Sequence, residues 1–335
     1  MVPALQVPKG PFGIILNANA GRVTPRLHQA ISQVVSPDHI FMTESQDHAK
    51  EVLETCLERE YRTIFAGGGD GTIMDTVNTL EGFRSDVDTL PSVGVLRLGT
   101  GNAMARWLGS KSPVRDLVNF QAGDVHRTHP LRMIRAEGTL CPFGGMGYDA
   151  AVLNDYYTLK NRFDDTAFRK MFRGISGYLI AAVTKTVPSY SSKEMPEITI
   201  INHGRPAYRI GYNGEEIGEP VLTGEVLYHG PASILSAGAT PQIGYGVRLF
   251  PFAGLRAGRF QLRVASLNPI QALWNLPATA RGTLRHPKLH DFYVDKVQII
   301  SNNEMPFQLG GDPKGYRNDV TLEVAEHEVN FIGRA

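Results

Sequence analysis

The most informative segment of the sequence is Gly67-Gly68-Gly69-Asp70-Gly71-Thr72, which directly follows the apolar run Thr63 to Ala66 and precedes a helical pattern. Three successive glycines lack the Cβ atoms that would keep a phosphate away from the backbone, and the start of the helix offers N–H groups with a partial positive charge. Asp70 would repel a phosphate unless a cation lay between them. We therefore expect Asp70 to be either a Mg²⁺ ligand or the base that accepts a hydroxyl proton. A tight turn capped by Thr72, with no ligand, is the alternative explanation.

A second glycine turn repeats this construction, and a third, polar turn would reach the same edge of the sheet. Leu98-Gly99-Thr100-Gly101-Asn102-Ala103 lies at the next strand-to-helix junction, and Asn17-Ala18-Asn19-Ala20-Gly21-Arg22 follows the first strand. The carboxyl ends of neighbouring parallel strands face one crevice, where ligands of open α/β sheets bind. None of the turns is a G-x-x-x-x-G-K-[ST] loop or a G-x-G-x-x-G fingerprint, so they predict neither an ordinary P-loop nor a Rossmann dinucleotide site.

The rhythm of the chain changes near residue 129. Before it, short apolar runs such as Phe12 to Leu16 alternate with helical patterns, which predicts a doubly wound parallel sheet flanked by helices. After it, short β-branched runs are separated by Gly and Pro and interrupted by helical patterns at Thr166 to Val187 and at about Ile270 to Leu284. We predict an α/β domain over residues 1–128 and a β-rich domain, an antiparallel sandwich or barrel with helical insertions, over residues 129–335.

Composition disfavours several classes of protein. The 335 residues carry 34 Lys and Arg against 33 Asp and Glu, and so lack the basic field on which nucleic-acid binders rely. The two cysteines, Cys56 and Cys141, lie far apart, which favours a reducing, cytoplasmic setting. The first residues lack the apolar core of a secretory signal, and the apolar stretch Ile175 to Val183 is much shorter than the ~20 residues that span a bilayer. We expect any membrane contact to be made from the surface.

Four segments together resemble the diacylglycerol kinase catalytic-domain family, lipid kinases that include bacterial diacylglycerol kinases, sphingosine kinases and ceramide kinases. The resemblance spans nearly the whole chain. It implies a nucleotide-binding α/β domain joined to a β-sandwich that takes the lipid, and transfer of the ATP γ-phosphate to a lipid hydroxyl, with Mg²⁺, in the cleft between them. Asn17 to Gly21 is similar to the family's N-P-x-[AS]-G, Gly68 to Thr72 to its G-G-D-G-T, Leu98 to Ala103 to its L-G-[TS]-G-N-[DA], and Gly145 to Ala150 to its G-x-G-x-D-A.

The resemblance also implies roles for single residues. Asp149 would face the head group of the acceptor lipid, although an Asp that caps a helix at Ala150 is the structural alternative. The three turns would hold ATP and its metal ion through Asn17, Gly21, Arg22, Gly68, Gly69, Asp70, Gly71, Thr72, Leu98, Gly99, Thr100 and Asn102.

The chain departs from the family near its C-terminus. Where the family has D-G-E, with an Asp proposed to deprotonate the lipid hydroxyl, this sequence reads Gln308-Leu309-Gly310-Gly311-Asp312-Pro313. Gly310 replaces the Asp, and Asp312 replaces the Glu. Three outcomes stay open: Asp312 reaches the hydroxyl, Asp70 is the base, or the protein binds nucleotide and lipid without turnover. Because the nucleotide turns are intact, we expect Asp70 and Asp312 to be catalytic together and to be the carboxylates that meet the metal ion.

Other activities receive less support. NAD kinases share G-G-D-G-T but would not be expected to carry Leu98 to Ala103 or Gly145 to Ala150 in this arrangement. No G-x-S-x-G elbow occurs, so a serine hydrolase is not supported. A catalytically impaired regulator, acting as a nucleotide-gated lipid sensor, is the non-enzymatic alternative, and Gly310 motivates it.

The expected surroundings follow from the lipid acceptor. Phe168 to Ile175 is basic and aromatic, and the apolar run Gly177 to Val183 follows it, which suits the interface of an anionic membrane. A core helix with one solvated end is equally compatible with this pattern. We predict a cytoplasmic protein, peripheral at the inner face of the membrane, whose partners are ATP and a lipid alcohol and not nucleic acid. Homodimerisation is left open.

Overall fold

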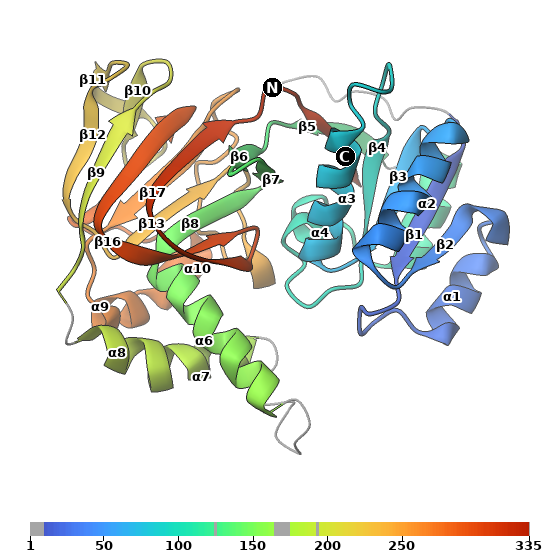
Figure 1. Cartoon of the computed structure of the whole chain (residues 1–335), viewed down its shortest axis with the longest axis horizontal. Coiled ribbons are helices and arrows are strands. Elements are labelled where there is room, and N and C mark those ends of the chain that lie inside the picture. Colours follow the sequence, from blue (N-terminus) through green and yellow to red (C-terminus); the bar gives the residue numbers. More distant parts are fainter. Residues whose placement is uncertain (1–9, 124–125, 164–174, 192–193, 335) are drawn as a thin grey trace. The chain divides into compact units, whose positions relative to one another are not determined.

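The computed structural model describes residues 10–123, 126–163, 175–191 and 194–334 (Figure 1). The chain divides into two compact units, each with its own sheet. The first unit consists of the residues up to Leu131 together with those from His327 onward, and the second consists of Arg132–Glu326. Except for its last residue, the basic stretch Phe168 to Ile175 lies outside the described residues.

The first unit is built on a six-stranded, mostly parallel sheet with the strand order β2-β1-β3-β4-β18-β5. Strands β2, β1, β3, β4 and β18 are parallel neighbours, and β5 is antiparallel to β18. The parallel sheet predicted from the alternating apolar and helical patterns is thereby confirmed. The strands are β1 (Phe12–Asn17), β2 (Ile40–Thr43), β3 (Thr63–Gly68), β4 (Ser92–Arg97), β5 (His126–Leu131) and β18 (Val329–Arg334).

Helices cover both faces of this sheet, as in a doubly wound fold. On one face, α1 (Pro25–Ser32) and α5 (Pro113–Ala122) pack over a core that includes Ile14, Phe65 and Leu96. On the other face lie α2 (Gln46–Glu58) and α3 (Asp70–Gly82), and there the buried Cys56 of α2 contacts Gly13 of β1. The shorter elements are η1 (Pro37–His39) and α4 (Ala103–Trp107).

The helices of the first unit begin where the sequence supplies a cap. Thr24 accepts a hydrogen bond from a backbone N–H ahead of α1, at 3.2 Å, and Ser45 does the same ahead of α2, at 3.1 Å. Such caps satisfy N–H groups that have no partner within the helix. Helix α3 differs, because its N-cap residue is Gly69, which has no side chain to offer.

The second unit is an antiparallel sheet of twelve strands. Ten follow the order β11-β10-β15-β14-β13-β8-β16-β17-β6-β7, while β9 pairs with β16 and β12 pairs with β9. The predicted β-rich character of this half is confirmed. The strands are β6 (Ile134–Ala136), β7 (Thr139–Cys141), β8 (Phe143–Gly147), β9 (Glu197–Asn202), β10 (Ala207–Ile210), β11 (Glu216–Val221), β12 (Val226–Pro231), β13 (Ile234–Gly238), β14 (Phe260–Ala265), β15 (Leu289–Val294), β16 (Lys296–Leu309) and β17 (Asp312–Val324).

Helices interrupt this sheet at both predicted places. The pattern at Thr166 to Val187 corresponds, from residue 175 onward, to helical turns, and the one near Ile270 is split in two because Pro277 cannot continue the hydrogen bonds of the helix before it. None of the described helices is long and apolar enough to cross a bilayer. The helical elements are α6 (Tyr148–Phe163), α7 (Ile175–Ala181), the π-helical turn η2 (Ala182–Thr186), α8 (Val187–Ser191), η3 (Gly244–Gly246), α9 (Pro269–Trp274) and α10 (Leu276–Arg281).

The division into units differs from the predicted boundary at residue 128 in two respects, because the first unit extends to Leu131 and also includes the C-terminal strand. The last strand, β18, returns to the first unit and inserts between β4 and β5. Its residues Phe331 and Ile332 are buried there. A short apolar run of this kind suits either sheet, so its pattern alone does not reveal which sheet it joins.

Candidate active site

The two glycine turns that follow β3 and β4 touch each other. A Cβ atom on Gly99 would lie 2.3 Å from the Cα atom of Gly69, a distance that real Cβ atoms do not reach. A Cβ on Gly69 would meet only the Cα of Gly99, at an ordinary 3.6 Å. Glycine is therefore required at Gly99 for the backbones to approach, whereas at Gly69 the fold leaves room for a side chain.

The turn after β1 joins the other two through a side-chain contact. The amide nitrogen of Asn17 donates a hydrogen bond to the hydroxyl of Thr72 at 2.9 Å, and the amide oxygen of Asn17 accepts one from the N–H of Asn19 at 2.9 Å. Gly68 lies beneath this contact, where a Cβ would be 2.3 Å from the Thr72 hydroxyl oxygen. All three turns thus meet at the carboxyl edge of one sheet, as their spacing predicts.

Asp70 connects α3 to the start of α4. Its Oδ1 accepts a hydrogen bond from the backbone N–H of Met104 at 3.2 Å. Burial raises the pKa of Asp70 above its ordinary value, and nearby backbone N–H groups of α4 oppose that rise. The carboxylate therefore has a structural role, holding α4 against the glycine turn of α3, whatever it also does in chemistry.

Asn102 shapes the turn that contains Gly99. It is buried and adopts a left-handed conformation with φ of 53°, which Asn tolerates better than most residues. Its side-chain oxygen accepts a hydrogen bond from the N–H of Gly99 at 3.0 Å, and its side-chain nitrogen donates one to the carbonyl of Gly99 at 2.6 Å. The amide of Asn102 is thus engaged with the backbone of its own turn.

The other predicted phosphate-binding residues differ in accessibility. Leu98 packs into the core with 4% of its surface exposed, so it can offer a ligand only its backbone. Gly21, Arg22 and Thr100 are exposed or lie in exposed turns. Gly71 belongs to the first turn of α3, next to Asp70.

Sequence reasoning missed Arg97. This residue ends β4 opposite Gly68, and its Nε is buried without a hydrogen-bond partner among the described residues. The pKa of Arg97 is lowered by burial and, after that, by the positive charges of Arg106 and Arg22. Since none of the three guanidinium groups has an ion pair within the described part of the chain, the cluster suits a polyanion. The sequence signal was a basic residue directly before the second glycine turn.

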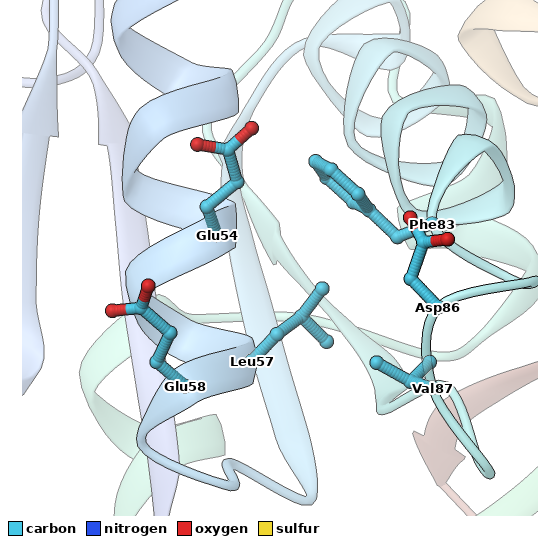
Figure 2. Close-up of a pocket in the computed structure, with 6 residues that line it drawn as sticks. All are labelled: Glu54, Leu57, Glu58, Phe83, Asp86 and Val87. Atoms are coloured by element: carbon cyan, nitrogen blue, oxygen red, sulfur yellow. The ribbon is translucent and has the colours of Figure 1, made fainter.

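The pocket drawn in Figure 2 is a separate feature of the first unit. It lies between α2 and the segment that follows α3, and its volume is about 340 Å³. Three carboxylates on its rim would repel a triphosphate, so we do not assign ATP to it. Its lining consists of Glu54, Leu57, Glu58, Phe83, Asp86 and Val87.

In the second unit, Asp149 lies in the first turn of α6 and presents an unsatisfied oxygen. Its Oδ2 accepts hydrogen bonds from the Ser236 hydroxyl at 2.9 Å and, more weakly, from the Gln308 amide at 3.4 Å. Its Oδ1 is buried and has no hydrogen-bond partner in the part of the chain that the structure describes. Burial raises the pKa of Asp149 to about 6, while Ser236 and Gln308 act in the opposite direction. A buried carboxylate oxygen without a donor is costly, and a donor group on a ligand would remove that cost.

Gly145 makes the close approach to Asp149 possible. A Cβ there would lie 3.0 Å from Oδ2 of Asp149 and 2.5 Å from the carbonyl oxygen of Leu235 in the neighbouring strand β13. Two residues later, Gly147 has φ of 104°, which other residues rarely adopt. The glycines of the Gly145 to Ala150 segment therefore serve the packing that brings Asp149 into place.

Asp312 follows a tight hairpin turn between β16 and β17. Gly310 and Gly311 have φ of 61° and 92°, as in a two-residue turn that favours Gly, Asn or Asp. The N–H of Gly311 donates to the side-chain oxygen of Gln308 at 2.9 Å, so Gln308 links the hairpin to Asp149. Sequence reasoning missed Gln308, because an amide in a strand carries no motif.

Asp312 itself is exposed and lies near aromatic side chains. Its charge contributes to raising the pKa values of Tyr157 and Tyr178, for which burial is the larger cause. The rings of Tyr156 and Tyr178 stack with their centroids 4.0 Å apart. Asp312 thus combines a solvent-accessible carboxylate with an aromatic surface contributed by α6 and α7.

The donor set suits a magnesium ion that arrives with a nucleotide. The described residues contain no group of three or more His, Cys, Asp or Glu side chains that could hold a metal ion. Mg²⁺ usually keeps several waters and binds through one or two carboxylates plus phosphate oxygens of a substrate. Single carboxylates such as Asp70 and Asp312 meet that requirement.

Comparison with known proteins agrees with this geometry. Residues 11–133 match the family model of the diacylglycerol kinase catalytic domain. The chain is 24% identical over 285 residues to the probable lipid kinase YegS-like of Enterobacter sp. (strain 638), which covers 82% of this chain and 79% of that protein. Over 99 residues it is 29% identical to diacylglycerol kinase 2 of Arabidopsis thaliana, covering 29% of this chain and 14% of that one.

Solved structures show the same fold. A diacylglycerol kinase from Bacillus anthracis str. Sterne superposes with a TM-score of 0.62 at 17% identity, covering 96% of each chain. This agreement extends the likeness in fold beyond the matched N-terminal segment to the second unit. Residues 11–133 thus resemble a diacylglycerol kinase catalytic domain, and the chain is similar to lipid kinases over about four-fifths of its length.

Proposed function

We propose that the protein transfers the γ-phosphate of ATP to a hydroxyl of a diacylglycerol, ceramide or sphingoid-type lipid. The observation that carries the proposal is the contact between Gly69 and Gly99 beside the unpaired guanidinium groups of Arg22, Arg97 and Arg106. Bare backbone next to a helix start, together with concentrated positive charge, supports binding of a triphosphate.

In this proposal the three turns bind the phosphates of ATP. The N-terminus of α3, which has no side-chain cap, would direct its N–H groups toward phosphate oxygens, and the Arg97 cluster would balance their charge. Asn17 and Asn102 act as positioning residues, because both are engaged in holding the turns together. Asp70 and Asp312 are the candidates for meeting Mg²⁺, which supplies charge neutralisation on the phosphoryl group when bound.

The second unit would receive the acceptor lipid. Oδ1 of Asp149, which lacks a donor, would accept a hydrogen bond from a hydroxyl or amide N–H of the head group. Gln308 ties Asp149 to the hairpin of Asp312, so it would keep the two carboxylates in register. An accessible Asp312 beside Tyr157 supports a role as proton acceptor for a lipid alcohol.

In the proposed reaction, the γ-phosphoryl group passes from ATP to the lipid hydroxyl. The hydroxyl oxygen of the lipid forms a bond to the γ-phosphorus, the bond between that phosphorus and the β–γ bridging oxygen breaks, and ADP leaves with the electron pair. The hydroxyl proton passes to a carboxylate. We favour Asp312 for this task, because its carboxylate is exposed to solvent.

The test is incubation of the purified protein with γ-labelled ATP, Mg²⁺ and a panel of diacylglycerol, ceramide and sphingosine in mixed micelles. We expect label in at least one lipid and little label with Asp70→Asn. Binding of ATP without labelling of any lipid would overturn the kinase proposal and favour a regulatory protein that binds nucleotide and lipid. A parallel reaction contains NAD in place of lipid, and labelling of NAD but of no lipid would favour the NAD kinase alternative.

A further inference from the structure

A short helical segment of the second unit displays large apolar side chains to solvent. Trp274 is 81% exposed and Ile270 is 53% exposed, and their spacing of four residues places both on one face of α9. Leu276, at the start of α10, is also exposed. An exposed tryptophan is unusual, because its large apolar surface is normally buried at least in part.

Hydrogen bonds at both ends of α9 hold this face toward solvent. Asn268 and Gln271 form a reciprocal capping box, with hydrogen bonds of 2.8 and 3.1 Å, and Pro269 occupies the first turn. The C-terminal end of α9 is held by the side-chain nitrogen of Asn275, which donates to the carbonyl of Gln271 at 2.8 Å. A helix fixed in this way cannot turn Trp274 inward without breaking its caps.

Other helical segments at the same end of the second unit also expose apolar side chains. Helix α8 packs against α9, and Figure 1 shows both at the end of the second unit opposite β10 and β11. Leu179 of α7 and Val183 of the π-helical turn, which lead into α8, are exposed as well. We call Leu179, Val183, Ile270, Trp274 and Leu276 the apolar end.

Two exposed arginines lie on or next to α10, the helix that follows α9 in the chain. Among the other basic residues between Val226 and His290, Arg256 pairs with Glu216 and the buried Arg263 pairs with Asp291, so these two add no free charge. Arg281 is exposed on α10, and Arg248 is exposed beside it, with its N–H bonded to the carbonyl of Ala280 at 3.0 Å. Neither guanidinium group has an ion pair with any described residue.

We propose that the apolar end docks on an anionic lipid bilayer, with Trp274 and Ile270 inserted at the interface and Arg248 and Arg281 facing acidic head groups. Tryptophan favours the boundary between head groups and acyl chains, and each basic residue near an anionic surface adds attraction. The guanidinium groups of Arg248 and Arg281, which have no ion pair with any described residue, complement acidic head groups, and this charge complementarity favours the bilayer as the occupant. The proposal rests on the proposed function only in that a lipid substrate supplies the reason for docking.

The experiment uses Trp274 as its own reporter. The chain has two tryptophans, so Trp107→Phe leaves Trp274 as the single one. We expect its fluorescence to shift to the blue with vesicles of phosphatidylcholine and phosphatidylglycerol, and much less with phosphatidylcholine alone. An unchanged spectrum, or an equal shift with both kinds of vesicle, would overturn the proposal.

Binding to the same vesicles, measured by sedimentation, provides the second readout. We expect Trp274→Ala to weaken it at least about tenfold, Ile270→Ala less, and the pair Arg248→Gln with Arg281→Gln to remove the preference for anionic lipid. The matched control is Leu222→Ala, because Leu222 is 51% exposed, close to the value for Ile270, and lies between β11 and β12. Equal losses for Leu222→Ala and Ile270→Ala would contradict the docking surface.

Activity on a short-chain lipid dispersed in water separates this proposal from the proposed function. Trp274→Ala should leave that activity unchanged while vesicle binding falls. If the wild type phosphorylates no lipid but its vesicle binding depends on Trp274, the kinase proposal fails and the docking surface stands. If Trp274→Ala only dissociates an oligomer and leaves vesicle binding intact, a second copy covers this face and the docking proposal fails.

Discussion

The glycine turns of the first unit and the cluster around Asp149 in the second unit are assembled in different ways. In the first unit, the turns that contain Gly69 and Gly99 follow neighbouring parallel strands, so the topology of the sheet brings them together. In the second unit, Asp149 and Gln308 are 159 residues apart in the sequence, and their hydrogen bond depends on the antiparallel pairing of β8 with β16. The first arrangement is encoded in local motifs, whereas the second depends on long-range register.

The largest expected effect is that of Gly99→Ala. Its methyl group would have to push the backbone of Gly69 away, and such overpacking costs about 1–3 kcal/mol of folding free energy. Because the turns would separate, we expect ATP affinity to fall by at least about 100-fold. Thermal melting and calorimetry measure the two effects. If Gly99→Ala melts at the wild-type temperature and binds ATP with the wild-type affinity, the two turns do not touch.

Two substitutions of Asp70 should distinguish its role in catalysis from its role in stability. Asp70→Asn keeps an oxygen that can accept the N–H of Met104 but removes the charge, so we expect kcat to fall by roughly 100-fold or more with little change in melting temperature. Asp70→Ala also removes the hydrogen bond and should lower stability by about 1 kcal/mol. Near-normal turnover in a folded Asp70→Asn protein would leave Asp70 with its structural role alone.

The hairpin of the second unit allows the matching experiment. If Asp312 accepts the proton, Asp312→Asn should abolish lipid phosphorylation and leave ATP affinity intact. Gly310→Asp restores the residue that the family carries, and the positive φ of Gly310 in a two-residue turn is one that Asp tolerates. We therefore expect Gly310→Asp to melt close to the wild type. Unchanged phosphorylation by Asp312→Asn would transfer the base role to Asp70.

These contrasts indicate what a sequence can predict. The meeting of the three turns followed from strand order and spacing, and the structure confirms it through Gly69, Gly99 and the bond from Asn17 to Thr72. Arg97 and Gln308 were missed because a single basic or amide residue has no pattern until the fold supplies its neighbours. The hydrogen bonds between the Asn102 side chain and the backbone of Gly99 also depend on the left-handed conformation of Asn102, which a motif does not reveal.

The return of β18 to the first sheet could not be predicted for a related reason. Its residues Val329–Arg334 form an ordinary apolar run, and only pairing with β4 and β5 assigns them to a sheet. Local patterns thus fix which segments become strands, while long-range partners depend on the whole fold.

Substitution of Asp149 should give the most specific effect, because it should raise the stability of the folded protein in a pH-dependent way. Its pKa of about 6 in the folded protein exceeds the value of about 4 for an unfolded chain, so the folded state binds the proton more tightly. The stabilising contribution of the protonated group is present below about pH 4 and is lost as the pH rises through about 6.

Asn cannot ionise, so Asp149→Asn avoids this loss of stability at higher pH. We expect the variant to melt higher than the wild type near neutral pH, by an amount on the order of 2 kcal/mol in free energy, and the difference to shrink toward pH 4. Lipid phosphorylation should fall at the same time, because the acceptor loses its charged partner. A difference in melting that is independent of pH would show that the carboxylate is not destabilised by burial.

The most direct test of the account is the affinity for ATP with Mg²⁺, measured by calorimetry, of Gly69→Ala against Gly82→Ala. The two glycines lie at opposite ends of α3, and both leave room for a Cβ in the folded protein. Only Gly69 belongs to the turn that we assign to the phosphates. The account predicts that Gly69→Ala weakens binding at least about tenfold while Gly82→Ala binds as the wild type does. Equal affinities in the two folded variants would contradict the placement of ATP at these turns.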